Sequence, residues 1–426
     1  MTLPVVGFAG MTHLGINSAA ATAARGFPVL GYDCDAALIQ RLAQHDLPIV
    51  EPGLDELVAA NQDRLSFSSD TADLARCDIV YIAADVPTDD NAKSDLTPIL
   101  ALIDAVASKL QPHAVMVVLC QVPPGFTRSI SSVPHDRLVY QVETLVFGRA
   151  VERAMYPERF IIGLADPARG LPPKVEQVLR AFDCPLLPMC YESAELAKIS
   201  INFCLVASVT VANTLAEVSE AIGADWSEIV PALKLDKRIG QFAYLAPGLG
   251  ISGGNLERDL HTVLDIAAVK KTEVGVVEAW IANSHWRKDW LFRTLDQVVL
   301  KAKPDARIAV LGLAYKENTH STKNSPSLLL LRQLESREVC VHDPVVPASV
   351  VPWARGAETA LETARGADVL VIATPWPEYR QLDPAELAGV MNGRVIIDPY
   401  RMVDGEGAAK AGFVTHVLGR SASSPQ

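Results

Sequence analysis

The sequence of 426 residues lacks several features that would assign it to particular classes of protein. Lysine and arginine (38) are fewer than aspartate and glutamate (50), the formal net charge is -12, and no basic tract occurs. This balance argues against nucleic acid as a partner. No apolar run reaches the roughly 20 residues of a membrane-spanning helix, and no basic segment precedes the first apolar stretch, as it would in a signal peptide. These absences predict a cytoplasmic protein.

Cysteine is also scarce and scattered. The seven cysteines include no Cys-x-x-Cys pair, so a zinc site is not expected and no metal site is predicted. An odd, dispersed set of this kind predicts reduced thiols, most of them in the core. The seven positions are Cys34, Cys77, Cys120, Cys184, Cys190, Cys204 and Cys340.

The N-terminal region has the layout of a dinucleotide-binding unit. An apolar strand over Pro4–Ala9 is followed by a turn from Gly10 to Gly15, a helix, and a second strand that ends in Asp33. The first glycine of such a turn permits the sharp bend, and the helix N-terminus faces the pyrophosphate. The acid after the second strand binds the ribose hydroxyls and repels a 2′-phosphate, so Asp33 favours NAD over NADP.

The glycine pattern is incomplete, because Thr12 stands at the position closest to the pyrophosphate. Its side chain could clash with a phosphate, or its hydroxyl could donate to one. Further apolar strands over Cys77–Ala84 and Ala114–Cys120 follow at the expected intervals and support the interpretation. A Rossmann-like domain that holds no dinucleotide is the alternative.

A long helix is predicted from Glu192 to Gly223. The segment contains no proline and no internal glycine, its apolar residues recur at steps of three and four, and it ends at a glycine suited to a C-cap. Lys198 and Asn202 lie four residues apart and therefore project from one face of this helix.

A second α/β unit is predicted after a glycine-rich loop and further helices. Arg307–Leu313 begins it, and three more apolar runs have the character of buried parallel strands. The predicted fold is α/β, with two Rossmann-like doubly wound parallel-sheet domains joined by a long central helix and a helical middle domain. The predicted domains are residues 1–190, which bind NAD, 191–300, which are helical, and 301–426, which form the second Rossmann-like unit.

A series of motifs then resembles one family along nearly the whole chain. PIVEPGLDEL, a VPT loop, VPPG, ETLVFG, YPERFIIG and ESAELAK occur in the order typical of the UDP-glucose/GDP-mannose dehydrogenase family. That family oxidises the C6 alcohol of a nucleotide sugar to a carboxylate and uses two NAD per turnover. The resemblance implies NAD as cofactor and a nucleotide sugar as substrate, with a UDP-sugar favoured. It also implies that residues 301–426 bind the nucleotide part of this substrate, and that the protein is a homodimer through the central helical region.

The resemblance also implies roles for individual residues. We expect catalytic roles for Lys198, Asn202, Asp259, Glu143 and Asn255. The expected cofactor-binding residues are Gly10, Thr12, Gly15, Asp33, Thr88, Gln121 and Lys323. The expected substrate-binding residues are Tyr244, Leu245, Gly248, Gly250, Arg238 and Lys316.

The departures from the family pattern concern one half of its reaction. The nucleophilic cysteine position is Asn255, and an amide cannot serve as the nucleophile. Phe147 stands where the family has the glutamate that assists thioester hydrolysis, and Gln121 stands where it has a threonine. Lys323 stands where the family has the arginine that brings the cofactor and catalytic domains together. Lysine keeps the charge but lacks the bidentate fork of arginine. The groups able to stabilise an alkoxide and move a proton are retained, namely Lys198, Asn202, Asp259 and Glu143.

Three hypotheses follow. The first is an NAD-dependent oxidoreductase that performs one two-electron oxidation of a nucleotide sugar, from alcohol to aldehyde or ketone. The second is a relative that binds nucleotide sugar and NAD without catalysis, as a binding or regulatory protein. The third is a full four-electron dehydrogenase that bypasses Asn255. Purely structural roles also remain open: Lys198 as a solvated helix lysine, Asn202 as an interhelical hydrogen-bonding residue, and Asp259 as a cap.

Overall fold

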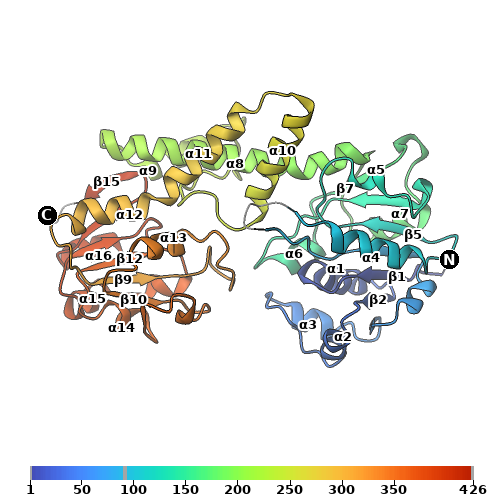
Figure 1. The fold of residues 1–426 in the computed structure, drawn as a ribbon, viewed down its shortest axis with the longest axis horizontal. Coiled ribbons are helices and arrows are strands. Elements are labelled where there is room, and N and C mark those ends of the chain that lie inside the picture. The colour runs from blue at the N-terminus through green and yellow to red at the C-terminus, as the bar shows by residue number, and fades with distance from the viewer. Residues whose placement is uncertain (1, 90–93, 424–426) are drawn as a thin grey trace. The chain divides into compact units, whose positions relative to one another are not determined.

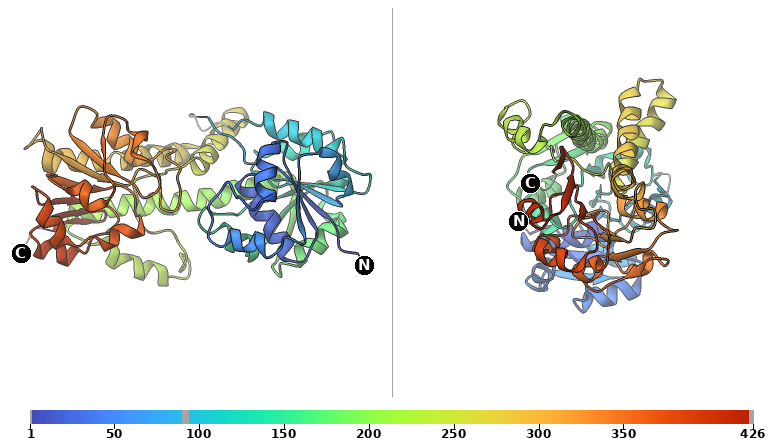
Figure 2. Two further views of the ribbon diagram at one scale, coloured as in Figure 1. Left: turned by 90° about the horizontal axis from the view of Figure 1, so that it is seen from below. Right: turned by 90° about the vertical axis from the view of Figure 1, so that its left-hand side faces the viewer.

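The computed structural model describes residues 2–89 and 94–423, and the chain divides into two compact units, residues 1–201 and 202–426. Each unit contains one β-sheet with helices packed around it (Figures 1 and 2). The fold is therefore α/β with two Rossmann-like units and a helical middle region, as the sequence predicts.

The sheet of the first unit has eight strands in the order β3-β2-β1-β4-β5-β6-β7-β8. Neighbouring strands are parallel except for β6 and β7, which pair antiparallel, so this sheet is not purely parallel as predicted. The strands are β1 (Val6–Ala9), β2 (Val29–Tyr32), β3 (Leu65–Ser68), β4 (Ile79–Ile82), β5 (Val115–Val118), β6 (Leu138–Gln141), β7 (Phe160–Leu164) and β8 (Leu186–Cys190).

The chain direction in this sheet places a ligand-binding crevice beside β1. β1, β2, β4 and β5 are buried along their whole length, as expected for parallel strands covered on both faces. The order reverses between β1 and β4, and ligands bind at such switch points, outside the carboxyl ends of the strands. The helices of this unit are α1 (His13–Ala24), α2 (Ala36–Ala43), α3 (Leu54–Ala59), α4 (Thr97–Ala107), α5 (Phe126–Ser129), α6 (Ala150–Met155) and α7 (Pro173–Arg180).

The long predicted helix is α8, Tyr191–Ile222, and Gly223 follows it with a positive φ of 80°. By length and composition alone α8 could cross a membrane, with a mean hydropathy of 1.7 in its most apolar window, so the expectation that no segment meets this limit is wrong. Core helices of soluble proteins meet the same limit, and one such helix among the described residues does not indicate a membrane protein.

The second unit combines helices with a sheet of seven strands in the order β11-β10-β9-β12-β13-β14-β15, in which only the last pair is antiparallel. Its strands are β9 (Ile308–Leu311), β10 (Val339–His342), β11 (Arg355–Gly356), β12 (Val369–Ile372), β13 (Val395–Ile397), β14 (Val414–Val417) and β15 (Arg420–Ser423). Its helices after α8 are α9 (Trp226–Leu235), α10 (Asn255–Lys270), α11 (Gly275–Lys288), α12 (Trp290–Leu295), α13 (Pro326–Gln333), α14 (Ala360–Ala364), α15 (Pro384–Val390) and α16 (Gly405–Lys410).

One sequence expectation about the core needs correction. The cysteines are all free, but three of them, Cys34, Cys190 and Cys204, are exposed, so they are not mostly core residues. Each exposed thiol lies at or beyond the end of a strand or on a solvent-facing turn of a helix, positions for which composition alone gives no signal.

Candidate active site

The turn between β1 and α1 has the close packing of a dinucleotide cradle. Gly10 has a φ of +97°, and a Cβ at this position would lie 2.6 Å from the Cβ of Ala84. A Cβ on Gly15 would lie 1.9 Å from the carbonyl oxygen of Gly10. The Asp33 carboxylate accepts a hydrogen bond of 2.8 Å from the Met11 N–H, which fixes the acid beside the turn. These residues fit the cofactor that the sequence predicts.

The conformation of Thr12 explains why glycine is not required at this position of the turn. Its φ is −86°, so its backbone does not require glycine. Its hydroxyl donates to the carbonyl of Ala83 at 3.3 Å and accepts from the N–H of Asp85 at 3.1 Å. The side chain is therefore bound to the segment after β4, and the hydroxyl is used within the protein.

Asp85 itself was not predicted from the sequence. Its backbone N–H donates to the Thr12 hydroxyl, which joins the segment after β4 to the residue before α1. The surrounding protein desolvates the carboxylate and raises its pKa, although the side chain reaches solvent. The only sequence signal was an acid immediately after a buried strand, at the edge of the sheet where ligands bind.

A second group that the sequence did not reveal joins the loop of Phe147 to α1. His13 Nε2 lies 2.7 Å from Glu51 Oε1, and the Glu51 carboxylate also accepts from the N–H groups of Gly148 and Ala150. The His13 ring stacks on Phe147 with 4.0 Å between the ring centroids. Phe147, which stands where the resemblance has a glutamate, thus presents an aromatic ring to an imidazole.

Lys198 and Glu143 form an ion pair in the first unit. Lys198 Nζ lies 3.2 Å from Glu143 Oε2, and only 12% and 17% of the two side chains are exposed. The other Glu143 oxygen accepts from the N–H of Leu145. A lysine simply solvated at the helix surface would be far more exposed, so that structural alternative does not hold for Lys198.

The first turn of α8 is fixed to the loop before α5. The buried Glu195 carboxylate accepts from the N–H of Gly125 at 2.6 Å and from that of Thr127 at 2.8 Å, and burial raises its pKa. Lys198 is one turn further along the same helix. Gln121 precedes this loop and is half-buried, and Thr88 pairs with Ser94 in an isolated bridge.

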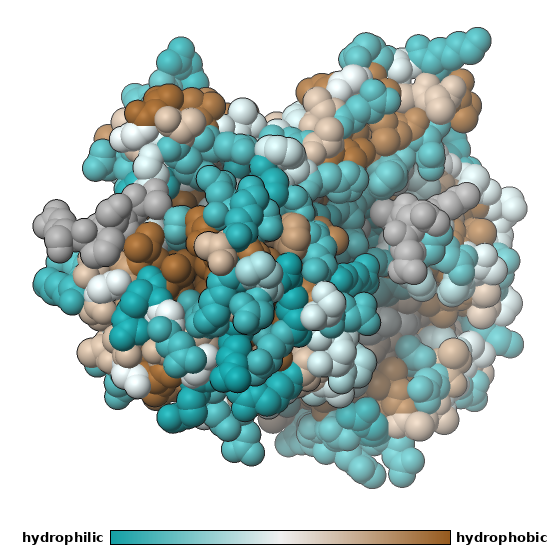
Figure 3. Space-filling model, turned by 60° about the vertical axis from the view of Figure 1, so that its left-hand side comes forward, coloured by the Kyte–Doolittle hydropathy of each residue, from teal (hydrophilic) through white to brown (hydrophobic). Residues whose placement is uncertain are grey.

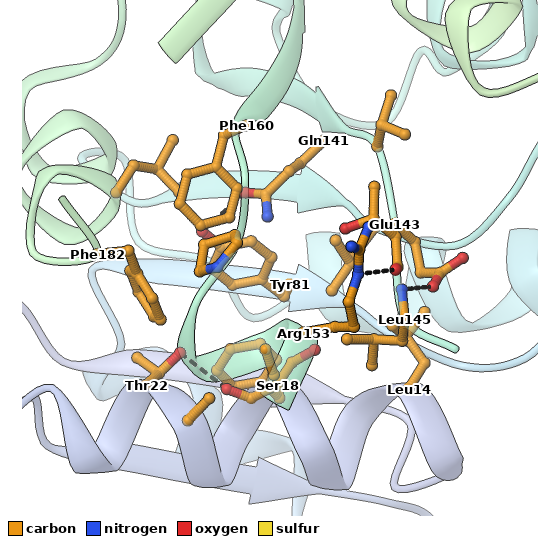
Figure 4. Close-up of a pocket in the computed structure, with 18 of the residues that line it drawn as sticks. Leu14, Ser18, Thr22, Tyr81, Gln141, Glu143, Leu145, Arg153, Phe160 and Phe182 are labelled. Carbon is orange, nitrogen blue, oxygen red and sulfur yellow. Dashed lines mark hydrogen bonds between the residues drawn. The ribbon is translucent and has the colours of Figure 1, made fainter. Parts of the chain in front are cut away.

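A small cavity lies beneath the segment that carries Glu143 (Figure 4). Its volume of about 60 Å³ is far below that of a nucleotide site. Tyr81 donates to Gln141 across it at 3.3 Å, and Phe160 and Phe182 close one side. The cavity is therefore too small for a nucleotide.

In the second unit, Asn202 and Asp259 are paired. The amide of Asn202 donates to Asp259 Oδ2 at 2.5 Å, and both side chains are buried. Arg258, also buried, places its Nε 3.6 Å from Asp259 Oδ1. The pairing joins α8 to the second turn of α10, so Asn202 does form an interhelical hydrogen bond. Arg258 was not among the predicted residues.

Asn255 is the first residue of α10 and is exposed, with Gly254 as the N-cap. The loop before it is held by residues 323 and 324. The N–H of Gly253 donates to the Lys323 carbonyl at 3.1 Å, and the Asn324 amide donates to the Gly253 carbonyl at 2.9 Å. The backbone of Lys323 thus supports the loop that presents Asn255.

The predicted substrate-binding residues differ in how the second unit holds them. The Gly248 N–H donates to the Asn213 side chain at 2.8 Å, and a Cβ on Gly250 would lie 2.4 Å from the Ser284 carbonyl. Leu245 is buried and its carbonyl accepts from Trp226. Of the remaining predicted residues, Tyr244 and Arg238 are exposed and Arg238 is paired with Asp236, while Lys316 lies over the Tyr315 ring.

A glycine cradle at the switch point of a mainly parallel sheet, with a half-buried lysine–carboxylate pair in the same unit, is typical of a dinucleotide-dependent dehydrogenase. Residues 4–183 match the NAD binding domain of the UDP-glucose/GDP-mannose dehydrogenase family, residues 192–284 its central domain, and residues 309–405 its UDP binding domain. The chain belongs to this family. It is an NAD-dependent oxidoreductase of the nucleotide-sugar dehydrogenase type, as the sequence predicts.

Curated relatives and solved structures agree with this assignment. The chain is 31% identical over 435 residues to UDP-glucose 6-dehydrogenase of Rhizobium meliloti, covering 96% of this chain and 98% of the relative. It is 28% identical over 434 residues to UDP-glucose 6-dehydrogenase TuaD of Bacillus subtilis, covering 97% and 92%. A UDP-glucose dehydrogenase structure from Pyrobaculum islandicum is 26% identical, has a TM-score of 0.83 and covers 93% and 94% of the two chains.

Proposed function

We propose that this protein oxidises an alcohol of a UDP-sugar to an aldehyde or ketone in a single two-electron step. The observation that carries the proposal is the contrast between two sets of residues. The pairs Lys198–Glu143 and Asn202–Asp259 are intact, whereas Asn255 stands at the position of the thiol nucleophile. Without a nucleophile the first oxidation is chemically possible, but the covalent second oxidation is not.

The Lys198–Glu143 pair supplies the groups that alcohol oxidation requires. NAD, when bound, accepts the hydride from the carbinol carbon. As the hydride leaves, negative charge develops on the oxygen, and the ammonium of Lys198 is suited to stabilise it because most of the side chain is shielded from water. Glu143, 3.2 Å away, is suited to accept the alcohol proton, directly or through a water molecule.

The Asn202–Asp259 pair has a positioning role in this proposal. It ties α8 to the N-terminal end of α10, where Asn255 is exposed. An amide at Asn255 can hydrogen-bond a sugar hydroxyl or carbonyl but cannot form a thioester. The Asn202–Asp259 bond would hold α8 to α10 in a binding protein as well, so the Lys198–Glu143 pair is the feature that favours the enzyme over the binding protein.

A UDP-sugar is the proposed substrate class because residues 309–405 match a UDP binding domain. We also propose three domains, residues 1–190, 191–300 and 301–426, with NAD on the first and the nucleotide of the substrate on the third. A cytoplasmic location is proposed because the curated relatives are enzymes of nucleotide-sugar metabolism by name. Cell fractionation would test it, and recovery in the membrane fraction would contradict it.

We further propose a homodimer formed through α8. Val211, Leu215, Val218 and Ile222 follow one another at helical spacing and are 51%, 42%, 45% and 72% exposed. Such a stripe is unusual on a monomer, where exposed apolar residues are normally scattered. On the face drawn in Figure 3 hydrophilic residues predominate, and apolar groups appear in several separate places.

Replacing Leu215 and Val218 together by glutamate should convert the dimer to a monomer, because two charges would be buried without partners. Sedimentation velocity at several protein concentrations measures the change. Val269→Glu is the matched control, since Val269 is 77% exposed on α10 and outside the stripe. A monomeric parent protein, or a double variant that stays dimeric, would contradict the proposal.

The proposed reaction is tested by incubating the protein anaerobically with NAD and a panel of UDP-, GDP- and dTDP-sugars. The account expects NADH formation with a UDP-sugar and a product two mass units lighter than the substrate. Sugar binding without NADH formation for every member of the panel would favour the binding protein. A product with two NADH formed per sugar would favour the four-electron enzyme.

A further inference from the structure

A buried carboxylate in the first unit joins two segments that are far apart in the sequence. Glu51 is 4% exposed, and its Oε1 lies 2.7 Å from the Nε2 of His13, the first residue of α1. The same carboxylate accepts hydrogen bonds from the N–H groups of Gly148 at 2.9 Å and Ala150 at 3.2 Å. Because these contacts satisfy a carboxylate that water does not reach, Glu51 holds the end of α1 to the loop between β6 and α6.

A ring contact adds to this junction. The imidazole of His13 stacks on the ring of Phe147, with 4.0 Å between the ring centroids and an angle of 29° between the planes. His13 is 9% exposed, whereas Phe147 is 44% exposed, so the loop covers part of the imidazole. His13 therefore contacts the loop in two ways, through Glu51 and through its own ring.

The same loop carries the base of the proposed reaction. It comprises residues 142–149, which form no helix or strand, and Glu143 lies near its start, 3.2 Å from Lys198. In its middle the carbonyl of Thr144 accepts from Arg153 at 3.4 Å, but Arg153 belongs to α6, the helix that the loop leads into. Side chains of other elements must therefore fix the course of the loop, and Glu51 and His13 supply such contacts.

His13 also belongs to the dinucleotide site. It follows the turn that begins at Gly10, and it starts the helix whose N-terminus faces the pyrophosphate in folds of this kind. A dinucleotide bound at the turn would lie against the backbone that carries His13, while the imidazole extends to Glu51 and Phe147. This one residue thus connects the cofactor site with the loop of Glu143.

We propose that His13 and Glu51 are positioning residues, which hold the loop of Glu143 to the dinucleotide turn and transmit NAD binding to it. Glu143 is then in place for proton transfer when the cofactor is bound. Position matters for the rate, because a misplacement of about 1 Å can cost about 10²-fold. The role of Glu143 as base rests on the proposed function, whereas the coupling between NAD and the loop does not.

The first test measures the order of the loop without turnover. Hydrogen–deuterium exchange of residues 142–150 is compared in the parent protein and in His13→Phe, with and without NAD. Phenylalanine keeps a ring for the stack and removes the N–H that Glu51 accepts. NAD should slow exchange of this segment in the parent protein and not in the variant. His113→Phe is the matched control and should behave as the parent does, because His113 pairs with Asp78 at 3.4 Å but is 60% exposed.

The second test measures initial rates of NADH formation with the UDP-sugar that is active in the panel. His13→Phe should lower kcat about 10- to 100-fold, and by far more than it changes the NAD dissociation constant. His13→Gln should recover most of the rate, since its amide N–H can replace the Nε2–H donor. In a Glu143→Gln background His13→Phe should cause no further loss, because a positioning residue acts through the group that it positions.

A second variant, Glu51→Gln, keeps the test decisive where His13→Phe does not fold. It loses one of two acceptor oxygens and should show a smaller change in the same direction. Exchange of residues 142–150 that NAD does not slow in the parent, or slows equally in both variants, would overturn the proposal. So would an undiminished loss of kcat in the Glu143→Gln background. If no UDP-sugar gives NADH, the proposed function fails, but the exchange measurement still decides whether NAD binding orders the loop through His13.

Discussion

Replacing Lys198 by methionine should lower the maximal rate of NADH formation about 10³-fold, the loss expected when one preorganised group that stabilises an oxyanion is removed. Methionine keeps the unbranched stem and removes only the charge. Lys198 is 12% exposed and 3.2 Å from Glu143, so its charge acts in a poorly solvated environment where water cannot replace it. Initial rates at saturating NAD and UDP-sugar measure the change.

The matched control is Lys174→Met. Lys174 also forms an ion pair in the first unit, with Asp78, but its side chain is 45% exposed. This control should retain the parent rate, and both variants should bind NAD as the parent does. If Lys198→Met were as active as Lys174→Met, Lys198 would not stabilise the alkoxide, and its pairing with Glu143 would be purely structural.

Introducing the missing thiol with Asn255→Cys should not restore carboxylate formation. A thiolate at the start of α10 can add to the aldehyde and lose a second hydride, but the thioester then requires an activated water. The position that supplies this base in the family is Phe147, whose ring stacks on His13 at 4.0 Å. The variant should therefore give at most one additional NADH per enzyme and then stop.

Mass spectrometry of the intact protein measures the outcome, because a trapped thioester adds the mass of the oxidised nucleotide sugar to the chain. Asn255→Ser is the matched control, since it has a similar size and no thiol, and it should show neither the burst nor the adduct. Steady carboxylate production by Asn255→Cys alone would refute the assignment of a hydrolytic role to position 147.

The fold could be predicted from the sequence because its strands are continuous apolar runs separated by glycine turns. Pro4–Ala9 and Arg307–Leu313, for example, contain β1 and β9. The antiparallel direction of β7 could not be predicted, since it depends on how the chain returns after β6 and leaves no periodicity in the sequence.

The candidate site was predicted in part. Spacing places Lys198 and Asn202 on one helix, and Glu143 and Asp259 were identified by resemblance. Their pairing could not be predicted, because Lys198 and Glu143 are 55 residues apart and Asn202 and Asp259 are 57 apart, so only the fold brings them together. Asp85 and the His13–Glu51 contact were missed for the same reason. Each side chain is ordinary in its own segment, and its importance arises only where separate strands end side by side.

The central claim is that the reaction stops after one oxidation, and the number of NADH molecules formed per nucleotide sugar tests it most directly. The measurement uses the UDP-sugar that gives activity in the panel, in limiting amount, with excess NAD and an aldehyde-trapping hydrazide, followed to completion. The account predicts one NADH per sugar and recovery of the trapped carbonyl product. Two NADH per sugar and a uronic acid would contradict it.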